Sequence, residues 1–255
     1  MQGVGQDDPV EFARLLQAFI GVCQAVAYAN ANGVVHRDLK PQNVVLGGFG
    51  EVIVLDWGEA KLVRPTNATD DVAVTEQAAD VPVPAENTRF VEVTAEVADL
   101  EKTYGLVGTP AYLSPEQAEQ RIDDIDQRTD VYGLGTILFH VVAGISPHGS
   151  RPGEPQEFDL RKLIDRIITG PTPRLREFDP AASLALEAVC AKAMAKSQAE
   201  RYVSATELAK DVQRFLADEP VSVLNEPLSV RMSRWMKRHR TLVTTTAVAL
   251  IVAII

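Results

Sequence analysis

Apolar residues recur at three- and four-residue steps across residues 9–31, which predicts a long amphipathic helix beginning at Pro9 and ending before Gly33. Residues 129–143 are almost wholly apolar, which is typical of a buried central helix. Further amphipathic stretches separated by turns rich in proline and glycine predict three more helices, over residues 159–169, 182–196 and 204–217.

Between the first two helices the pattern changes to short apolar runs. Residues 44–46 and 52–55 flank a turn that contains three glycines, which predicts a small β-hairpin over residues 44–55. Residues 64–102 are polar, acidic and without an apolar period, so we expect a largely disordered loop there. The whole pattern predicts a mostly helical α+β fold.

The charge of the chain is unevenly distributed. The net charge of −10 over 255 residues argues against general nucleic-acid binding. Residues 65–101 carry nine acidic residues against Arg89 alone, whereas residues 231–240 carry five basic residues and no acid. The two cysteines, Cys23 and Cys190, both lie in helical apolar patterns, so we expect core residues rather than a disulfide or metal pair.

The strongest chemical signal is the run His-Arg-Asp-Leu-Lys-Pro-Gln-Asn at residues 36–43, followed thirteen residues later by Asp56-Trp57-Gly58. A carboxylate and an amide in one loop, with a second carboxylate across a short hairpin, suit phosphoryl transfer. Such a site needs one group for the hydroxyl proton and others to hold magnesium against the phosphates.

These motifs resemble the catalytic loop and metal-binding motif of serine/threonine protein kinases, and residues 9–217 resemble the large C-terminal lobe of that family. The resemblance implies that Asp38 orients the substrate hydroxyl and accepts its proton, and that Lys40 contacts the transferred phosphate. It implies that Asn43 and Asp56 bind Mg²⁺ and position ATP, since hard cations prefer oxygen ligands. Trp57 stands where the family usually has phenylalanine.

The run from Gly108 to Glu116 resembles the end of the family's activation loop, with Ser-Pro-Glu in place of Ala-Pro-Glu. The acidic segment 59–108 is then a long activation loop. The resemblance implies that Thr109 bonds Asp38 and Lys40, and that Glu116 forms a buried ion pair with Arg201.

Two further expectations concern the support of residues 36–43. The resemblance implies that Asp130 accepts hydrogen bonds from the backbone around His36 and Arg37, although a simple helix cap is an equally good interpretation of Asp130 alone. Arg37 would also form a pocket for a phosphorylated residue of the activation loop. His140 and His148 show no metal-ligand spacing, and we interpret both as structural.

The family's small lobe has no counterpart in this sequence. Residues 1–8, expected to be disordered, hold neither its glycine-rich phosphate loop nor its strand lysine. We therefore expect a fragment that is inactive alone, belonging to a serine/threonine protein kinase of the bacterial, planctomycete-type, membrane-anchored kind. The alternative is a catalytically silent binding module. Protein substrates are the implied partners, and a homodimer is an open alternative.

The C-terminal residues carry a membrane signal. After a linker and basic juxtamembrane segment at residues 218–240, residues 242–255 contain no charge. These fourteen residues are fewer than the ~20 that span a bilayer. We expect residues 241–255 to be the start of a truncated transmembrane helix, because the basic cluster before them is typical of the cytoplasmic side. The protein would be single-pass with the kinase lobe in the cytoplasm; a tail that packs on the domain is the alternative.

Overall fold

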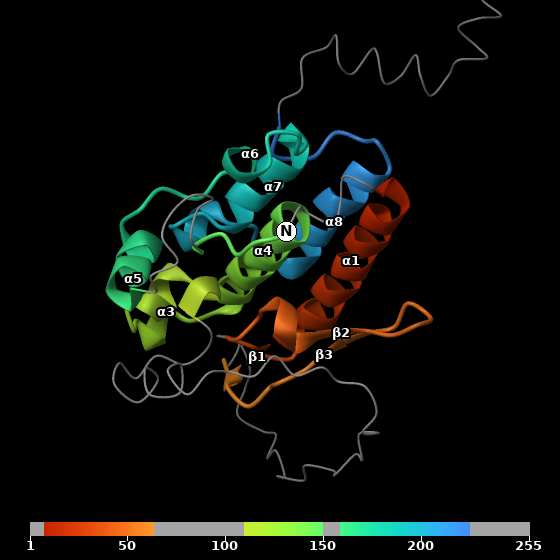
Figure 1. The fold of residues 1–255 in the computed structure, drawn as a ribbon. Helices are drawn as coiled ribbons and strands as arrows, with labels where there is room; N and C mark the ends of the chain where they lie inside the picture. Colours follow the sequence, from red (N-terminus) through yellow and green to blue (C-terminus); the bar gives the residue numbers. More distant parts are fainter. Residues whose placement is uncertain (1–7, 64–109, 150–158, 225–255) are drawn as a thin grey trace, which may run out of the picture.

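The computed structural model describes residues 8–63, 110–149 and 159–224. This part of the chain is mostly helical, with four short strands (Figure 1). The helices are α1 (Pro9–Ala31), α3 (Pro115–Ala118), α4 (Gln127–Ala143), α5 (Leu160–Ile168), α6 (Leu175–Phe178), α7 (Leu184–Ala193) and α8 (Ala205–Leu216). The strands are β1 (Val34–Val35), β2 (Val44–Leu46), β3 (Val52–Val54) and β4 (Lys61–Leu62).

Helix α1 has the bounds that the apolar period predicts. Its N-cap is Asp8, whose carboxylate accepts the amide of Val10 at 2.9 Å, and Pro9 occupies the first helical position. Gly33, at φ 76°, allows the chain to turn away after the helix. One face of α1 is buried against α4 and α8, and α8 lies beside it in Figure 1.

Helix α4 is the centre of the core, and the structure confirms the buried helix predicted there. Between Thr129 and Phe139 every residue is buried. Asp126 caps its start and Gly144, at φ 72°, ends it. Gly135 permits close packing on α7, because a Cβ at this position would lie 2.7 Å from the Cβ of Ala193.

The strands form two separate antiparallel pairs. The predicted hairpin is confirmed as β2–β3, in which Val44 pairs with Val54. The second pair, β1–β4, was not predicted; it joins Val34 to Leu62 and so places the start of the 36–43 loop beside the segment that follows Asp56.

The packed structure continues past α8, beyond the predicted domain boundary at residue 217. Val221 is only 2% exposed, and the buried carboxylate of Asp211 accepts hydrogen bonds from the amide and hydroxyl of Ser222 at 2.8 and 2.6 Å. The first part of the predicted linker, as far as Leu224, therefore packs on the domain.

Both cysteines are core residues, as predicted. Cys23 on α1 and Cys190 on α7 are buried free thiols, and burial raises the pKa of each. Among the described residues, α1 alone is long and apolar enough to cross a bilayer, by length and composition. Its position in the core accounts for that apolar content, because its buried face contacts α4 and α8. The membrane segment predicted at residues 241–255 lies outside the described residues.

Candidate active site

The loop of residues 36–43 runs between β1 and β2, and its polar side chains face one another. The Lys40 ammonium lies 2.6 Å from Oδ2 of Asp38. The Asn43 amide nitrogen donates to the Asp38 carbonyl at 2.8 Å and to its Oδ2 at 3.0 Å. Asp38 and Asn43 are both buried, so the carboxylate is held in one orientation by two neighbours within its own loop.

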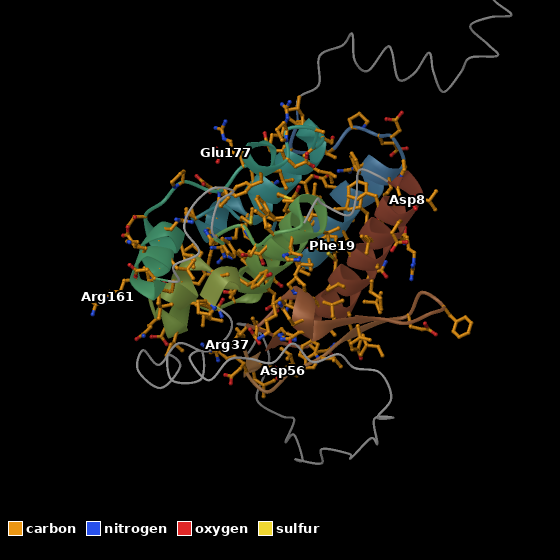
Figure 2. The ribbon with its side chains drawn as sticks, in the orientation of Figure 1. Asp8, Phe19, Arg37, Asp56, Arg161 and Glu177 are labelled. Carbon is orange, nitrogen blue, oxygen red and sulfur yellow. The ribbon has the colours of Figure 1, made fainter. Side chains whose placement is uncertain are left out.

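Asp56 follows β3, at the open end of the hairpin whose other strand, β2, begins directly after Asn43. The amide of Leu55 donates to the Asn43 carbonyl at 2.8 Å, which fixes the backbone before Asp56 against the loop. Asp56 adopts a left-handed backbone, with φ 61°, and is exposed. Arg37 and Asp56 both lie at the end of the molecule that carries the strands (Figure 2).

The donor set at this end suits a magnesium-bound nucleotide. The nitrogen of the Asn43 amide is committed to Asp38, which leaves its oxygen for a cation, and the exposed Asp56 carboxylate supplies a second hard oxygen. Among the described residues, no group of three His, Cys, Asp or Glu side chains gathers as a metal site. Two protein ligands are the arrangement expected where phosphate oxygens complete the coordination.

His36 and Trp57 connect the loop to the segment after β3. The ring centroids of His36 and Trp57 are 4.5 Å apart, and the indole N–H donates to the Val54 carbonyl at 2.9 Å. Nδ1 of His36 lies 3.3 Å from the amide of Asp38 and accepts from it, so Nε2 carries the proton and donates to the Leu55 carbonyl at 2.9 Å. The buried imidazole thus bridges the backbone next to both carboxylates.

Asp130 of α4 holds the backbone at the start of the 36–43 loop. Its carboxylate accepts the backbone amide of His36 at 2.9 Å and that of Arg37 at 3.0 Å, which are the hydrogen bonds that the resemblance implies. It is not the N-cap of α4, because Asp126 holds that position. Burial raises the pKa of Asp130, and the two amides oppose that rise.

Sequence reasoning missed two side chains that join this network. Asn30, in the last turn of α1, donates from Nδ2 to Oδ2 of Asp130 at 2.7 Å. Gln117 of α3 donates from Nε2 to the carbonyl of Arg37 at 2.7 Å. The spacing Ser114-x-x-Gln117 is a capping-box signal visible in the sequence, but neither of these two long-range contacts has a local signal.

The predicted ion pair between Glu116 and Arg201 is present and buried. Two parallel hydrogen bonds of 2.8 Å join the guanidinium to the carboxylate, and both side chains are 0% exposed. Thr129 donates a further hydrogen bond to Glu116 at 2.8 Å. Burial would raise the pKa of Glu116, but the hydrogen bonds and charge of Arg201 outweigh it and lower the pKa to about 2. The pair joins α3 to the turn before α8.

A small pocket separates the loop from the start of the next described segment. Its lining includes Asp38, Arg37, Tyr112 and Gln117. The Tyr112 hydroxyl lies 3.2 Å from Nδ1 of His140, and burial raises the pKa of Tyr112 to about 12. The predicted contacts of Thr109 with Asp38 and Lys40 lie outside the described residues. So does the predicted acidic loop after residue 63; its first residues, 59–63, are described and include β4.

The two histidines with no metal spacing have structural surroundings. His148 is buried, and its Nε2 lies 2.7 Å from the hydroxyl of Tyr132, with the two rings parallel and their centroids 6.4 Å apart. Burial lowers the pKa of His148 to about 3, so the ring is neutral in the fold. His140 contacts Tyr112, as described above.

Comparison with known proteins agrees with the geometry. Residues 6–78 match the protein kinase domain family. The chain is 33% identical over 207 residues to the serine/threonine-protein kinase PknD of Protochlamydia amoebophila, a match that covers 79% of this chain and 18% of that protein. It is 31% identical over 218 residues to the serine/threonine-protein kinase PknB of Mycobacterium tuberculosis, covering 85% of this chain and 28% of that protein.

A third relative is a probable serine/threonine-protein kinase PknB of Bifidobacterium longum, 29% identical over 214 residues, with 84% of this chain and 25% of that protein covered. The chain therefore spans between 18% and 28% of the length of these three relatives.

Proposed function

We propose that this chain, a protein serine/threonine kinase by family, forms the large lobe of an enzyme that transfers a phosphoryl group from ATP to serine or threonine hydroxyls of proteins. The observation that carries the proposal is the arrangement around Asp38. Its carboxylate is held by Lys40 at 2.6 Å and by Asn43 at 3.0 Å, beside the hairpin end that presents Asp56.

The residues of this network have separate tasks in the proposed reaction. Asp38 orients the substrate hydroxyl and accepts its proton, and Lys40 balances charge on the transferred phosphate. The oxygens of Asn43 and Asp56 would hold Mg²⁺, which neutralises charge on the ATP phosphates when it is bound. Thr109 would position the substrate beside Asp38.

The supporting residues act through the backbone. His36 bridges the backbone beside Asp38 and Asp56, Asp130 holds the amides of His36 and Arg37, and the ion pair of Glu116 with Arg201 fixes α3. Arg37 would also receive a phosphorylated activation-loop residue, because its guanidinium lies near the chain that follows β3, donating to the Glu59 carbonyl at 3.3 Å.

We propose that a nucleotide-binding small lobe completes the site and that the large lobe alone is inactive. The described residues supply the carboxylates and amide of the site but hold no counterpart of the small lobe's glycine-rich phosphate loop. The lysine in a described strand, Lys61 of β4, donates to the Ile122 carbonyl at 2.7 Å and is not a counterpart of the small lobe's phosphate-binding lysine. The hairpin also exposes apolar side chains that a second lobe would cover: Leu46, Phe49, Ile53 and Leu55. The alternative, a catalytically silent binding module, rests on the same missing phosphate-binding groups.

We also propose that the protein is anchored in the membrane through residues 231–255, with the kinase lobe in the cytoplasm. The support is in the sequence, where five basic residues precede an uncharged apolar run. Each base near an anionic leaflet gains about 1 kcal/mol.

Kinase assays of the chain alone, and of the chain joined to a small lobe of a related kinase, test the function. We expect transfer to a general Ser/Thr protein substrate only in the joined protein, and loss of that transfer with Asp38→Asn. Asp123→Asn, which changes an exposed aspartate of the turn Ile122–Asp124, is the matched control and should retain activity. A joined protein that binds ATP but gives equal, background transfer with and without Asp38→Asn would contradict the proposal and favour the binding module.

A further inference from the structure

The residue before the proposed base has an unusual backbone. Arg37 lies at φ 73°, in the left-handed region that side chains other than glycine rarely adopt. Such a conformation costs free energy and persists where neighbouring groups over-determine it. Because Arg37 directly precedes Asp38, relaxation of the Arg37 backbone would rotate the peptide group between them. That rotation would move the Asp38 Cα and with it the carboxylate.

Both polar groups of the Arg37 backbone are held from outside the loop. Its N–H donates to Oδ1 of Asp130 at 3.0 Å, from α4. Its C=O accepts from Nε2 of Gln117 at 2.7 Å, from α3. The resemblance to kinases implies the first contact, whereas the second comes from the structure. The peptide between Arg37 and Asp38 is therefore held at its carbonyl by the Gln117 side chain.

The other half of the Gln117 amide fixes the orientation of this donor. Its Oε1 accepts from the amide of Ser114 at 3.2 Å and from the hydroxyl of Ser114 at 3.0 Å. A flipped amide would set Oε1 against the Arg37 carbonyl and the NH₂ group against the Ser114 amide, so the hydrogen-bond network selects one orientation. The neighbouring residue, Glu116, is anchored by its ion pair with Arg201.

We infer that Gln117 is a positioning residue, which holds the Asp38 carboxylate in its reactive orientation by pinning the carbonyl of Arg37 to α3. Through this bond the segment of residues 112–118, which lines the pocket beside Asp38, is coupled to the loop of residues 36–43. The inference rests on the proposed kinase function for its catalytic consequence, but its structural part is independent of activity.

A single substitution separates positioning from helix capping. Gln117→Glu keeps the oxygen that accepts from Ser114, since Ser-x-x-Glu is also a capping box, but replaces the N–H donor to Arg37 with a carboxylate oxygen. Gln117→Ala removes both the oxygen that accepts from Ser114 and the N–H group that donates to Arg37. Gln127→Glu is the matched control, because the Gln127 side chain also donates to a backbone carbonyl, that of Val203 at 2.9 Å, away from the loop.

In the kinase joined to a small lobe, we expect Gln117→Glu and Gln117→Ala to lower kcat by about 10- to 100-fold, since small misplacements of a reacting group have effects of that size. The KM for ATP should change less than threefold, and Gln127→Glu should retain kcat within about twofold. If Gln117 only caps α3, Gln117→Ala lowers the unfolding midpoint while Gln117→Glu leaves kcat unchanged; that result overturns the inference.

Hydrogen exchange of the backbone amides, measured by NMR on the chain itself, gives a readout that needs no activity. We expect the amides of residues 37–39 to exchange at least about tenfold faster in Gln117→Glu, and those of α7 to be unchanged. Equal exchange in the wild-type protein and Gln117→Glu would refute the positioning role even if the joined protein were an active kinase. If Gln117→Glu speeds exchange but the joined protein is inactive even with Gln117, the result would support the positioning role and contradict only the proposed function.

Discussion

Replacing Glu116 with glutamine removes one charge from the most deeply buried ion pair in the described part of the chain. The substitution keeps the shape of the side chain but leaves the Arg201 guanidinium opposite a neutral amide, with 0% of the Arg201 side chain exposed. Arg201 would keep its hydrogen bonds to the carbonyls of Ala195 at 2.8 Å and Arg128 at 2.9 Å. One of its two hydrogen bonds to residue 116 would become a contact between N–H donors, so the loss combines charge balance with one hydrogen bond.

Two independent arguments give the size of the effect. Breaking a buried pair by removing one partner typically costs about 3–5 kcal/mol, because it leaves an uncompensated charge in the core. The pKa of Glu116 falls from an ordinary value of 4.5 to about 2. At about 1.4 kcal/mol for each pH unit, this fall corresponds to about 3 kcal/mol of folding free energy. We therefore expect Glu116→Gln to lower the free energy of unfolding by about 3 kcal/mol at pH 7.

The pH dependence follows from the direction of this pKa change. A carboxyl group whose pKa is lower in the folded protein stabilises the fold at pH values above its unfolded pKa. The contribution of Glu116 is thus complete above about pH 4.5 and is lost as the pH falls toward about 2. The difference in stability between the wild-type protein and Glu116→Gln should shrink across that window.

Urea denaturation at pH 7 and at pH 3, followed by circular dichroism, measures both effects. Glu119→Gln is the matched control, because Glu119 belongs to a solvent-exposed pair with Arg121 at 2.6 Å and should matter by less than about 1 kcal/mol. A loss below 1 kcal/mol for Glu116→Gln at pH 7, or a loss that does not diminish at pH 3, would show that the pair does not stabilise the fold as argued.

Three further results are expected from the same structure. Asp130→Asn should lower the free energy of unfolding by about 1–3 kcal/mol and slow phosphoryl transfer, because it replaces one of the two oxygens that accept the amides of His36 and Arg37 with an NH₂ group; denaturation and kinase assays of the joined protein test this, and unchanged kcat would contradict it. Gly133→Ala should destabilise the protein by about 1–3 kcal/mol, since its Cβ would lie 2.9 Å from the Leu39 Cβ. An unchanged melting temperature would show that the 36–43 loop can shift to accommodate the methyl group with no loss of stability. Replacing the five basic residues of 231–240 with glutamine should weaken binding to anionic vesicles by at least tenfold, and sedimentation that is insensitive to these charges would argue against the juxtamembrane interpretation.

The elements that the sequence predicts well are those with a sustained period or with apolar runs whose ends are marked by glycine or polar residues. Helix α1 has the predicted bounds, and α4 begins two residues before the predicted apolar stretch, because Gln127 and Arg128 complete its first turn. The hairpin is also found where glycines separate two short apolar runs. Helix α1 was predicted from a repeated spacing, whereas α4 and the hairpin were predicted from apolar runs and, for the hairpin, from the glycines between them.

The elements that were not predicted are too short for any period. Strands β1 and β4 have two residues each, and helices α3 and α6 have four, so neither alternation nor a helical repeat can develop. The burial of Val221 after α8 is likewise set by the tertiary contact of Ser222 with Asp211. Ser222 and Asp211 come together only in the folded protein.

The same distinction applies to the candidate site. Asp38, Lys40 and Asn43 could be predicted together, since they lie within six residues of one loop and form their contacts locally. The contacts of Asn30 with Asp130 and of Gln117 with Arg37 join residues 100 and 80 positions apart, and no local spacing indicates them. A motif therefore identified the polar groups of the site, but the residues that orient them became visible only in the structure.

The arrangement of these supports explains why a site of this kind can be built on a loop. Loops are usually less ordered than helices, yet the backbone around Asp38 is held by side chains of α4 and α3, and α4 itself is buried along most of its length. Gly133 lets α4 approach Leu39 closely. Since each support is a polar group whose partner is lost if the loop moves, displacement of the loop would leave the buried Asp130 carboxylate without its amide donors. The free-energy cost of leaving the Asp130 carboxylate without these hydrogen bonds restricts Asp38 to one position.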